Sequence, residues 1–220
     1  MKIKNEWLLI TIVLVPFVYL ATIWHELPER VPMHWNIQGE IDRYGNRAEL
    51  ILIPLLLPLL IYLIFLVVPL IDPKNKIGKT GQKYQRLKTW ITAFMSILAM
   101  VIIYSAKNRS LANPNYIILA LGVIYIIVGN YLQTVRPNYF IGIRTPWTLE
   151  NQTVWKDTHR IGGKLWSAGG FLIVISSLVF AERTNLIVFL IITGILTVAS
   201  VLYSYFRFRK ISGTAHTDSD

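Results

Sequence analysis

The sequence contains no cysteine, which excludes a disulfide bond or a thiolate metal site within this chain. Charged residues are also scarce, at 15% of the chain against roughly 25% in soluble domains. Neither an HExxH metal motif nor a GxSxG nucleophile elbow occurs, and no acid–base pair suggests itself. We therefore expect no catalytic residues, no metal ligands and no cofactor, and predict that the protein is not an enzyme.

Long apolar stretches, by contrast, are abundant, and hydrophobic residues make up 54% of the chain. Crossing the hydrocarbon core takes about 20 mostly apolar residues. Runs of about this length cover 7–24, 50–71, 90–104, 114–132, 165–181 and 185–206, of which the third is the shortest. The runs do not alternate as barrel strands do, and backbone amides in lipid must bond within their own segment. The sequence predicts an all-α membrane protein with about six transmembrane helices.

Basic residues are distributed unequally between the connecting segments. Alternate segments hold 16 Lys and Arg on one side of the predicted bundle and 6 on the other. The positive-inside rule then places both termini in the cytoplasm. We expect the net charge of +10 to set topology and to contact anionic membrane lipids, with no direct contact with nucleic acid. Lys2 and Lys4 begin the chain as in a signal peptide, but no small-residue cleavage site follows, so we expect a retained first helix.

Two connections are long enough to carry function, and we expect 25–49 outside the cell and 134–164 inside. The predicted units are helices 1 and 2 with the outer loop (1–72), a basic loop with helix 3 (73–113), helices 4 to 6 with the inner loop (114–208) and a disordered tail (209–220). In the second run, Pro54 and Pro58 leave open a broken helix that lines a cavity, whereas Pro69 near its end fits ordinary proline tolerance.

The outer loop is rich in proline and in turn-forming residues. Pro28 and Pro32 block helix and favour an extended path, and the glycines and polar residues that follow favour a compact, turn-rich cap. His25, Glu26 and His34 are residue types that bind zinc, but their spacing fits no helical metal motif. We therefore favour interfacial or hydrogen-bonding roles for these three side chains.

In the inner loop, apolar and aromatic residues alternate with Gly, Arg and Asn, which suits the interface between lipid and water. Arg144 has the chemistry either to grip a phosphate or carboxylate of a partner or to anchor on lipid phosphates, and both interpretations stay open. Trp155 and His159 are four residues apart and would share one helix face.

A short helix is predicted after this alternating stretch. Thr148 has the side chain of a helix N-cap, and the helix would cover 149–161. Gly162 and Gly163 would end that helix before the chain re-enters the membrane. The pattern predicts an amphipathic surface helix bent at the two glycines.

These two loops resemble those of the SdpI family, bacterial membrane immunity proteins against the sporulation-delaying toxin. The inner-loop match runs through Gly129-Asn130, Asn138-Tyr139-Phe140-Ile141-Gly142-Ile143-Arg144-Thr145-Pro146-Trp147-Thr148, Val154-Trp155, Thr158-His159-Arg160 and Gly162-Gly163, and it continues into the last two predicted helices. The outer loop resembles the DUF1648 domain that precedes the SdpI domain in longer members. That match runs through Leu27-Pro28, Val31-Pro32-Met33-His34-Trp35-Asn36 and Gly39-Glu40-Ile41-Asp42.

The resemblance implies a multi-pass protein of the bacterial cell membrane that confers resistance to a secreted toxic peptide of the SdpC type. It also implies signalling, in which a cytoplasmic autorepressor, SdpR in the prototype, is held at the membrane. On this basis the candidate toxin-facing residues are His34, Trp35, Asn36, Gly39 and Asp42. The candidate residues for the cytoplasmic partner are Asn138, Gly142, Arg144, Thr145, Trp147, Trp155, His159 and Gly162.

The alternative is a transporter or exporter of a small molecule or peptide, motivated by the prolines of the second run and by Asn130 near a membrane end. Ionisable residues normally mark the transport path within spans, and the predicted spans are nearly free of them. A membrane enzyme that uses His25, Glu26, His34 or His159 is the least favoured interpretation, because it lacks a metal spacing and an acid–base pair.

Overall fold

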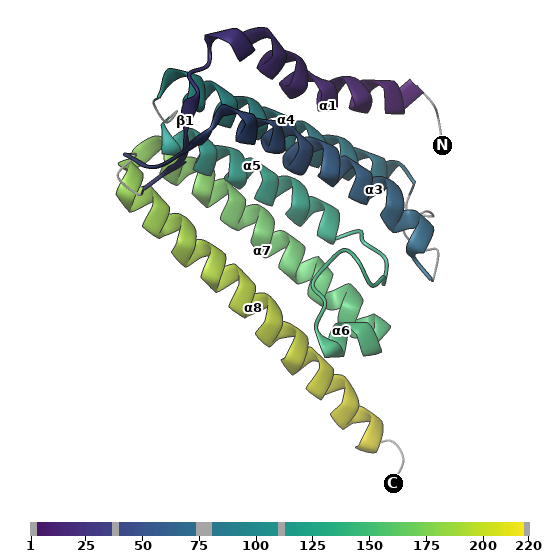
Figure 1. The fold of residues 1–220 in the computed structure, drawn as a ribbon. Helices are drawn as coiled ribbons and strands as arrows, with labels where there is room; N and C mark the ends of the chain where they lie inside the picture. Colours follow the sequence, from purple (N-terminus) through teal and green to yellow (C-terminus); the bar gives the residue numbers. More distant parts are fainter. Residues whose placement is uncertain (1–3, 37–39, 74–80, 110–112, 218–220) are drawn as a thin grey trace.

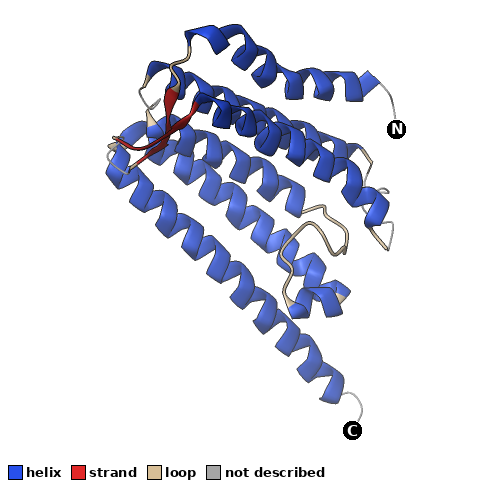
Figure 2. Ribbon diagram, viewed as in Figure 1, coloured by secondary structure: helices blue, strands red, loops and turns tan. Residues whose placement is uncertain are grey.

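The computed structural model describes residues 4–36, 40–73, 81–109 and 113–217. Within these ranges, six helical segments are long and apolar enough to cross a membrane, which confirms an all-α, multi-pass architecture. Figure 1 shows them side by side in one bundle, with both chain termini at the same end. We call this the terminal end. The opposite end carries a short β-hairpin (Figure 2) and is called the hairpin end.

The spanning elements are α1 (Lys4–Ile23), α2 (Leu52–Pro54), the π-helical η3 (Leu55–Leu59), α3 (Leu60–Ile71), α4 (Gln82–Asn108), α5 (Pro114–Leu132), α7 (Gln152–Val179) and α8 (Glu182–Thr217). The short elements are η1 (Trp24–Glu26), β1 (Arg30–Trp35), β2 (Ile41–Asn46), η2 (Arg47–Ile51) and α6 (Pro146–Glu150). Helices α1 to α4 pack together as one half of the bundle, and α5, α7 and α8 as the other. Helices α4 and α5 join the halves (Figure 1).

The second span keeps one helical path despite its prolines. Pro58 cannot donate a backbone hydrogen bond, and it lies within the wider π-helical turns of η3. Pro54 and Pro58 are four residues apart and both buried, and η3 packs against α4. The prolines therefore modify the helix locally without separating it into two.

Helices α5 and α7 approach each other backbone to backbone. In antiparallel register, Gly122 faces Gly170 and Gly129 faces Gly163. A Cβ atom added to Gly129 would lie 2.6 Å from the carbonyl oxygen of Gly163, and one added to Gly170 would lie 2.6 Å from that of Gly122. Small residues let membrane helices pack this closely. We call these four residues the glycine seam.

The predicted surface helix over 149–161 is wrong in its boundaries. Helix α6 begins after Thr145, whose side chain caps it, and Thr148 lies inside it. The N-cap of α7 is Asn151, whose side-chain oxygen accepts hydrogen bonds from the first backbone N–H groups of that helix. The structure thus has two helix N-caps, Thr145 and Asn151, in place of the single cap predicted at Thr148.

The predicted break at Gly162 and Gly163 is also wrong, because α7 runs through both glycines to Val179. Gly163 belongs to the glycine seam, and a Cβ atom on Gly162 would lie 2.5 Å from Cδ1 of Ile143. Both glycines therefore make room for neighbours. A helix in lipid must keep its own backbone hydrogen bonds, which opposes a break at this place.

At the hairpin end, a polar network joins the helices of the second half. The wholly buried amide of Asn185 on α8 donates to Oδ1 of Asn115 on α5 at 2.8 Å and accepts from Oγ of Ser176 on α7 at 2.7 Å. At the terminal end, Arg207 of α8 donates to Asp157 of α7 at 2.8 Å. Helix α8 extends to Thr217 and so covers part of the segment 209–220 for which we predicted disorder.

Candidate functional site

The hairpin, residues 30–46, confirms the extended path predicted from the prolines. Strands β1 and β2 are antiparallel, with Val31 opposite Gly45 and Pro32 opposite Tyr44, and the register shifts beyond Pro32. Val31 and Pro32 are buried, and Val31 belongs to an apolar cluster with residues of α1 and α4. The hairpin is therefore anchored on the helices through β1, while most of β2 is exposed.

Polar side chains pair across the exposed part of the hairpin. Nδ1 of His34 lies 2.6 Å from Oδ1 of Asp42 on the facing strand. Asn36 bonds twice to Glu40, through its amide nitrogen to the carboxylate at 3.1 Å and through its side-chain oxygen to the backbone N–H at 2.9 Å. His34 and Asp42 remain 64% and 43% exposed, so both stay open to a ligand.

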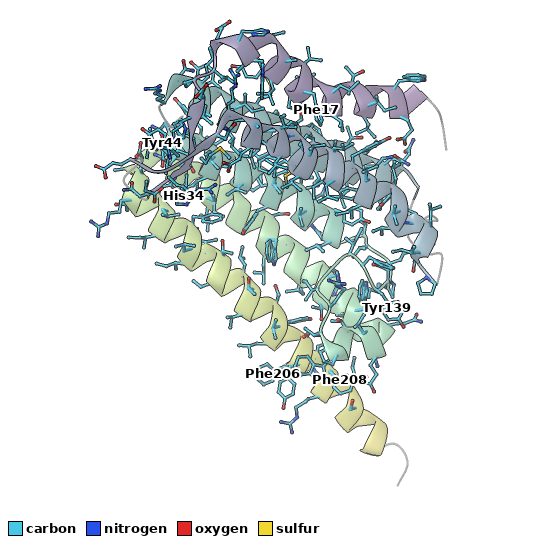
Figure 3. All side chains as sticks on the ribbon, viewed as in Figure 1. Phe17, His34, Tyr44, Tyr139, Phe206 and Phe208 are labelled. Atoms are coloured by element: carbon cyan, nitrogen blue, oxygen red, sulfur yellow. The ribbon has the colours of Figure 1, made fainter. Side chains whose placement is uncertain are left out.

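The hairpin carries two aromatic residues, Trp35 and Tyr44. The Trp35 side chain packs against the apolar cluster, and its indole N–H has no hydrogen-bond partner among the described residues. Tyr44 is exposed, and Figure 3 shows it with His34 at the hairpin end. The remaining candidate, Gly39, lies outside the described residues. The structure thus brings His34 and Asp42 together on the exposed face of the hairpin, whereas Trp35 packs toward the helices.

The residues weighed for metal binding have other surroundings. Glu26 forms an ion pair with Lys107 of α4 at 2.6 Å, and His25 is exposed beside it in η1. His34 is paired with Asp42. Within the described ranges, no group of three or more His, Asp or Glu side chains is placed to hold a metal ion.

The α5–α7 connector, residues 133–151, lies at the terminal end, where Figure 3 shows Tyr139. The buried side chain of Asn138 organises its turn. Its oxygen accepts from the backbone N–H groups of Phe140 and Ile141, and its nitrogen donates to the carbonyls of Arg136 and Ile141. Asn138 therefore acts on the connector itself.

Helix α7 supplies the residues that fasten the connector. His159 is 1% exposed, and its Nε2 accepts the backbone N–H of Ile143 at 2.9 Å while its Nδ1 donates to the carbonyl of Trp155 at 2.8 Å. Trp155 stacks on His159 at 4.0 Å between ring centroids and donates its indole N–H to the carbonyl of Val135. Gly142 has φ 128°, a backbone conformation that favours glycine. A Cβ atom at this position would also collide with the ring of His159.

The far side of the connector is tied to α8. Buried Thr145 donates its hydroxyl to Ser204 at 3.0 Å and caps α6 together with Thr148. The ring of Trp147 meets that of Tyr205 edge to face at 5.1 Å. Most of the residues predicted to bind a cytoplasmic partner are therefore buried, where they hold α7, α8 and the connector together.

Arg144 differs from the buried residues of this predicted set. Its side chain is exposed, and one guanidinium nitrogen donates to the carbonyl of Tyr139 at 2.6 Å. This bond holds the guanidinium over the connector while leaving further donors available to an anionic group. Both interpretations of Arg144, a protein partner and a lipid phosphate, fit this position.

Sequence reasoning missed a buried charge cluster at the terminal end. Lys88 was placed in the basic loop, but it lies on α4 with a 1% exposed side chain. Its Nζ is 2.6 Å from Oε1 of Glu6 on α1, and the hydroxyl of Tyr62 on α3 donates to the other carboxylate oxygen at 2.8 Å. The cluster ties three helices together, and no local pattern pairs residues that are 82 positions apart.

Comparison with known proteins bears on both surfaces. The family model described as the SdpI/YfhL protein family matches residues 134–204, and that of a domain of unknown function, DUF1648, matches 11–57. Immunity protein SdpI of Bacillus subtilis (strain 168) is 30% identical over 215 residues, which cover 96% of this chain and 99% of that protein. No solved structure matches the chain. The six spans and this full-length similarity make the protein a multi-pass protein of the bacterial cell membrane, and the chain belongs to the SdpI/YfhL family.

Proposed function

We propose that this membrane immunity protein protects a bacterial cell against a secreted toxic peptide of the SdpC type. The observation that carries the proposal is the full-length similarity to immunity protein SdpI, which spans the hairpin, the helices and the connector alike. In this proposal the protein protects the cell by binding the peptide.

The hairpin is the surface that we assign to the toxin. The exposed His34–Asp42 pair offers hydrogen-bond groups, and the exposed ring of Tyr44 on β2 adds apolar area beside it. An amphipathic peptide presents polar and apolar faces together, so this combination suits it. The anchoring of β1 on α1 and α4 holds the surface in one orientation, which lowers the entropy lost on binding.

The test is survival of a toxin-sensitive bacterium that expresses this protein alone and is challenged with purified sporulation-delaying toxin. We expect survival relative to an empty vector. The double variant His34→Ala/Asp42→Ala should lose protection, whereas Arg183→Ala, an exposed residue at the start of α8, should retain it. Death of cells that contain the wild-type protein in their membrane would refute this toxin as the ligand and would turn the search to other peptides and to transport.

A signalling role is the finer part of the proposal. We assign binding of an SdpR-like autorepressor to the connector, with Arg144 as its exposed cation and Trp147 beside it. The positive-inside rule predicts this end in the cytoplasm, where a repressor is available. The buried residues Asn138, Trp155 and His159 then act by shaping the connector.

Recruitment of the repressor can be measured separately from survival. A fluorescent repressor should move to the membrane when toxin is added to cells that express the protein. Arg144→Ala should reduce this movement, and Arg136→Ala, which removes an exposed cation from the same connector, should not. A repressor that stays in the cytoplasm with the wild-type protein would refute the signalling role and leave immunity intact.

A further inference from the structure

A cavity of about 380 Å³ lies at the terminal end, where the two halves of the bundle meet. Helix α4 lines it with Lys83, Arg86, Leu87 and Trp90, and α5 with Ile127 and Asn130. Its size is at the lower end of the about 300–1,000 Å³ of small-molecule sites. The cavity is separate from the hairpin and adjoins the start of the connector, whose Thr134 also lines it.

The α4 wall of the cavity carries unpaired positive charge. Lys83 and Arg86 are three residues apart and share a helix face. Both side chains are exposed, and neither forms a hydrogen bond or an ion pair with the part of the chain that the structure describes. The preceding sequence 74–80 adds three lysines and no acidic residue. The chemistry of this wall favours an anion.

Apart from the polar residues Asn130 and Thr134, the rest of the lining is apolar and aromatic. Leu87 is buried in the cluster that includes Tyr131, and Ile127 packs against the same cluster. Trp90 follows Arg86 by one turn and is 56% exposed, as an indole at the lipid–water interface would be. A soluble anion matches only the two cations, whereas an anionic phospholipid matches the cations and the apolar wall together.

We propose that this cavity binds the headgroup of an anionic phospholipid. Lys83 and Arg86 contact its phosphate, the amide of Asn130 bonds to its polar glycerol region, and its first methylene groups lie against Leu87, Ile127 and Trp90. Because α4 belongs to one half of the bundle and α5 to the other, the bound lipid bridges the two halves. The site is distinct from the surface assigned to the toxin, and it adjoins the connector assigned to the repressor without including Arg144.

Native mass spectrometry of the purified full-length protein tests the site, with phosphatidylglycerol titrated against phosphatidylcholine. The wild-type protein should retain phosphatidylglycerol selectively. Near a membrane surface each cation strengthens binding about fivefold, so Lys83→Gln/Arg86→Gln should weaken it about thirtyfold. The matched control Lys156→Gln/Lys164→Gln removes two exposed cations from α7 and should bind as the wild type does.

Three outcomes would overturn the proposal: no preference for phosphatidylglycerol by the wild-type protein, an equal loss in the control variant, or equally tight binding of glycerol phosphate. The last would mark a site for soluble anions. A cavity-filling variant keeps the test independent of charge. Ile127→Trp should abolish the retained lipid, whereas Val123→Trp, which adds the same bulk at an exposed position of α5, should not.

Discussion

The cluster of Glu6, Tyr62 and Lys88 predicts a large and asymmetric response to substitution. Removing one partner of a buried ion pair costs about 3–5 kcal/mol, because the remaining charge stays buried without compensation. Lys88 is 1% exposed and Glu6 15% exposed, so the ammonium depends more on its partner than the carboxylate does. We therefore expect Glu6→Leu to destabilise the protein more than Lys88→Met.

Two contacts determine where the free-energy cost of each single substitution lies within the range of about 3–5 kcal/mol. After Lys88→Met, Glu6 keeps the hydrogen bond from Tyr62, and such bonds to charged groups contribute about 1.5–3 kcal/mol. After Glu6→Leu, Lys88 keeps its contact with the ring of Tyr62, whose centroid lies 5.7 Å from Nζ. The double variant replaces both charges with apolar groups and should be much less destabilised than the sum of the single variants.

The assay is reversible unfolding in mixed micelles, with SDS as the denaturant and helix content as the signal. Lys107→Met serves as control, because its partner Glu26 is 61% exposed, and it should change the unfolding midpoint less. Additive single variants, or a Glu6→Leu protein as stable as the wild type, would refute the claim that this pair ties α1 to α4.

Other sites give predictions of the same kind. Gly129→Ala should destabilise the protein by about 1–3 kcal/mol through overpacking of the glycine seam. Its control is Gly194→Ala on α8, where a Cβ atom meets open space, and this variant should be neutral or stabilising in the same unfolding assay. Equal changes in the free energy of unfolding for the two variants would contradict close packing at the glycine seam. His159→Phe keeps a ring on Trp155 but loses the acceptor for Ile143, so hydrogen exchange of the connector should speed up about tenfold, and unchanged protection would contradict the fastening role. Asn185→Leu removes the hydrogen bonds that join α8 to Asn115 and Ser176 and should cost about 1–3 kcal/mol, measurable as a lower unfolding midpoint; an unchanged midpoint would contradict the network.

The spans were predictable because the thickness of the bilayer imposes a length on each apolar run. The fourth run, 114–132, coincides with α5. The third was underestimated, since α4 begins at Gln82 and includes Lys88, which a hydropathy count assigns to a loop. A buried cation at the end of a span can be recognised only with its partner, and Glu6 lies on another helix.

Sequence patterns located the segments that form the candidate surfaces. They did not show which residues of those segments are exposed to a partner and which make contacts within the protein. Proline and glycine patterns indicated an extended outer segment, but they did not predict the register in which β1 and β2 pair or the His34–Asp42 contact across them. In the connector, the residues that carry the family resemblance suggested a docking face. The structure gives Asn138 and His159 local roles, because a buried polar side chain must find its partners nearby.

The rule that glycine ends a helix failed at Gly162 and Gly163 for a physical reason. In water, a helix end can be satisfied by solvent, and glycine makes that end easy. Within a bundle in lipid, an exposed helix end has no such compensation, and the missing side chain instead permits the contact with α5 at Gly163 and with Ile143 at Gly162.

The composition of α7 also constrains how the chain enters the bilayer during synthesis. Its mean hydropathy of 1.4 is the lowest of the six spans, against 3.1 for Arg47–Ile71 and 2.6 for Glu182–Ser212. Seven of its 28 residues are glycine or serine that contact α5 or α8, and such residues contribute little to partitioning into lipid. On hydropathy alone, we expect α7 to be the span that leaves the translocon least readily, and its contacts with α5, already synthesised, and with α8, which follows, would compensate.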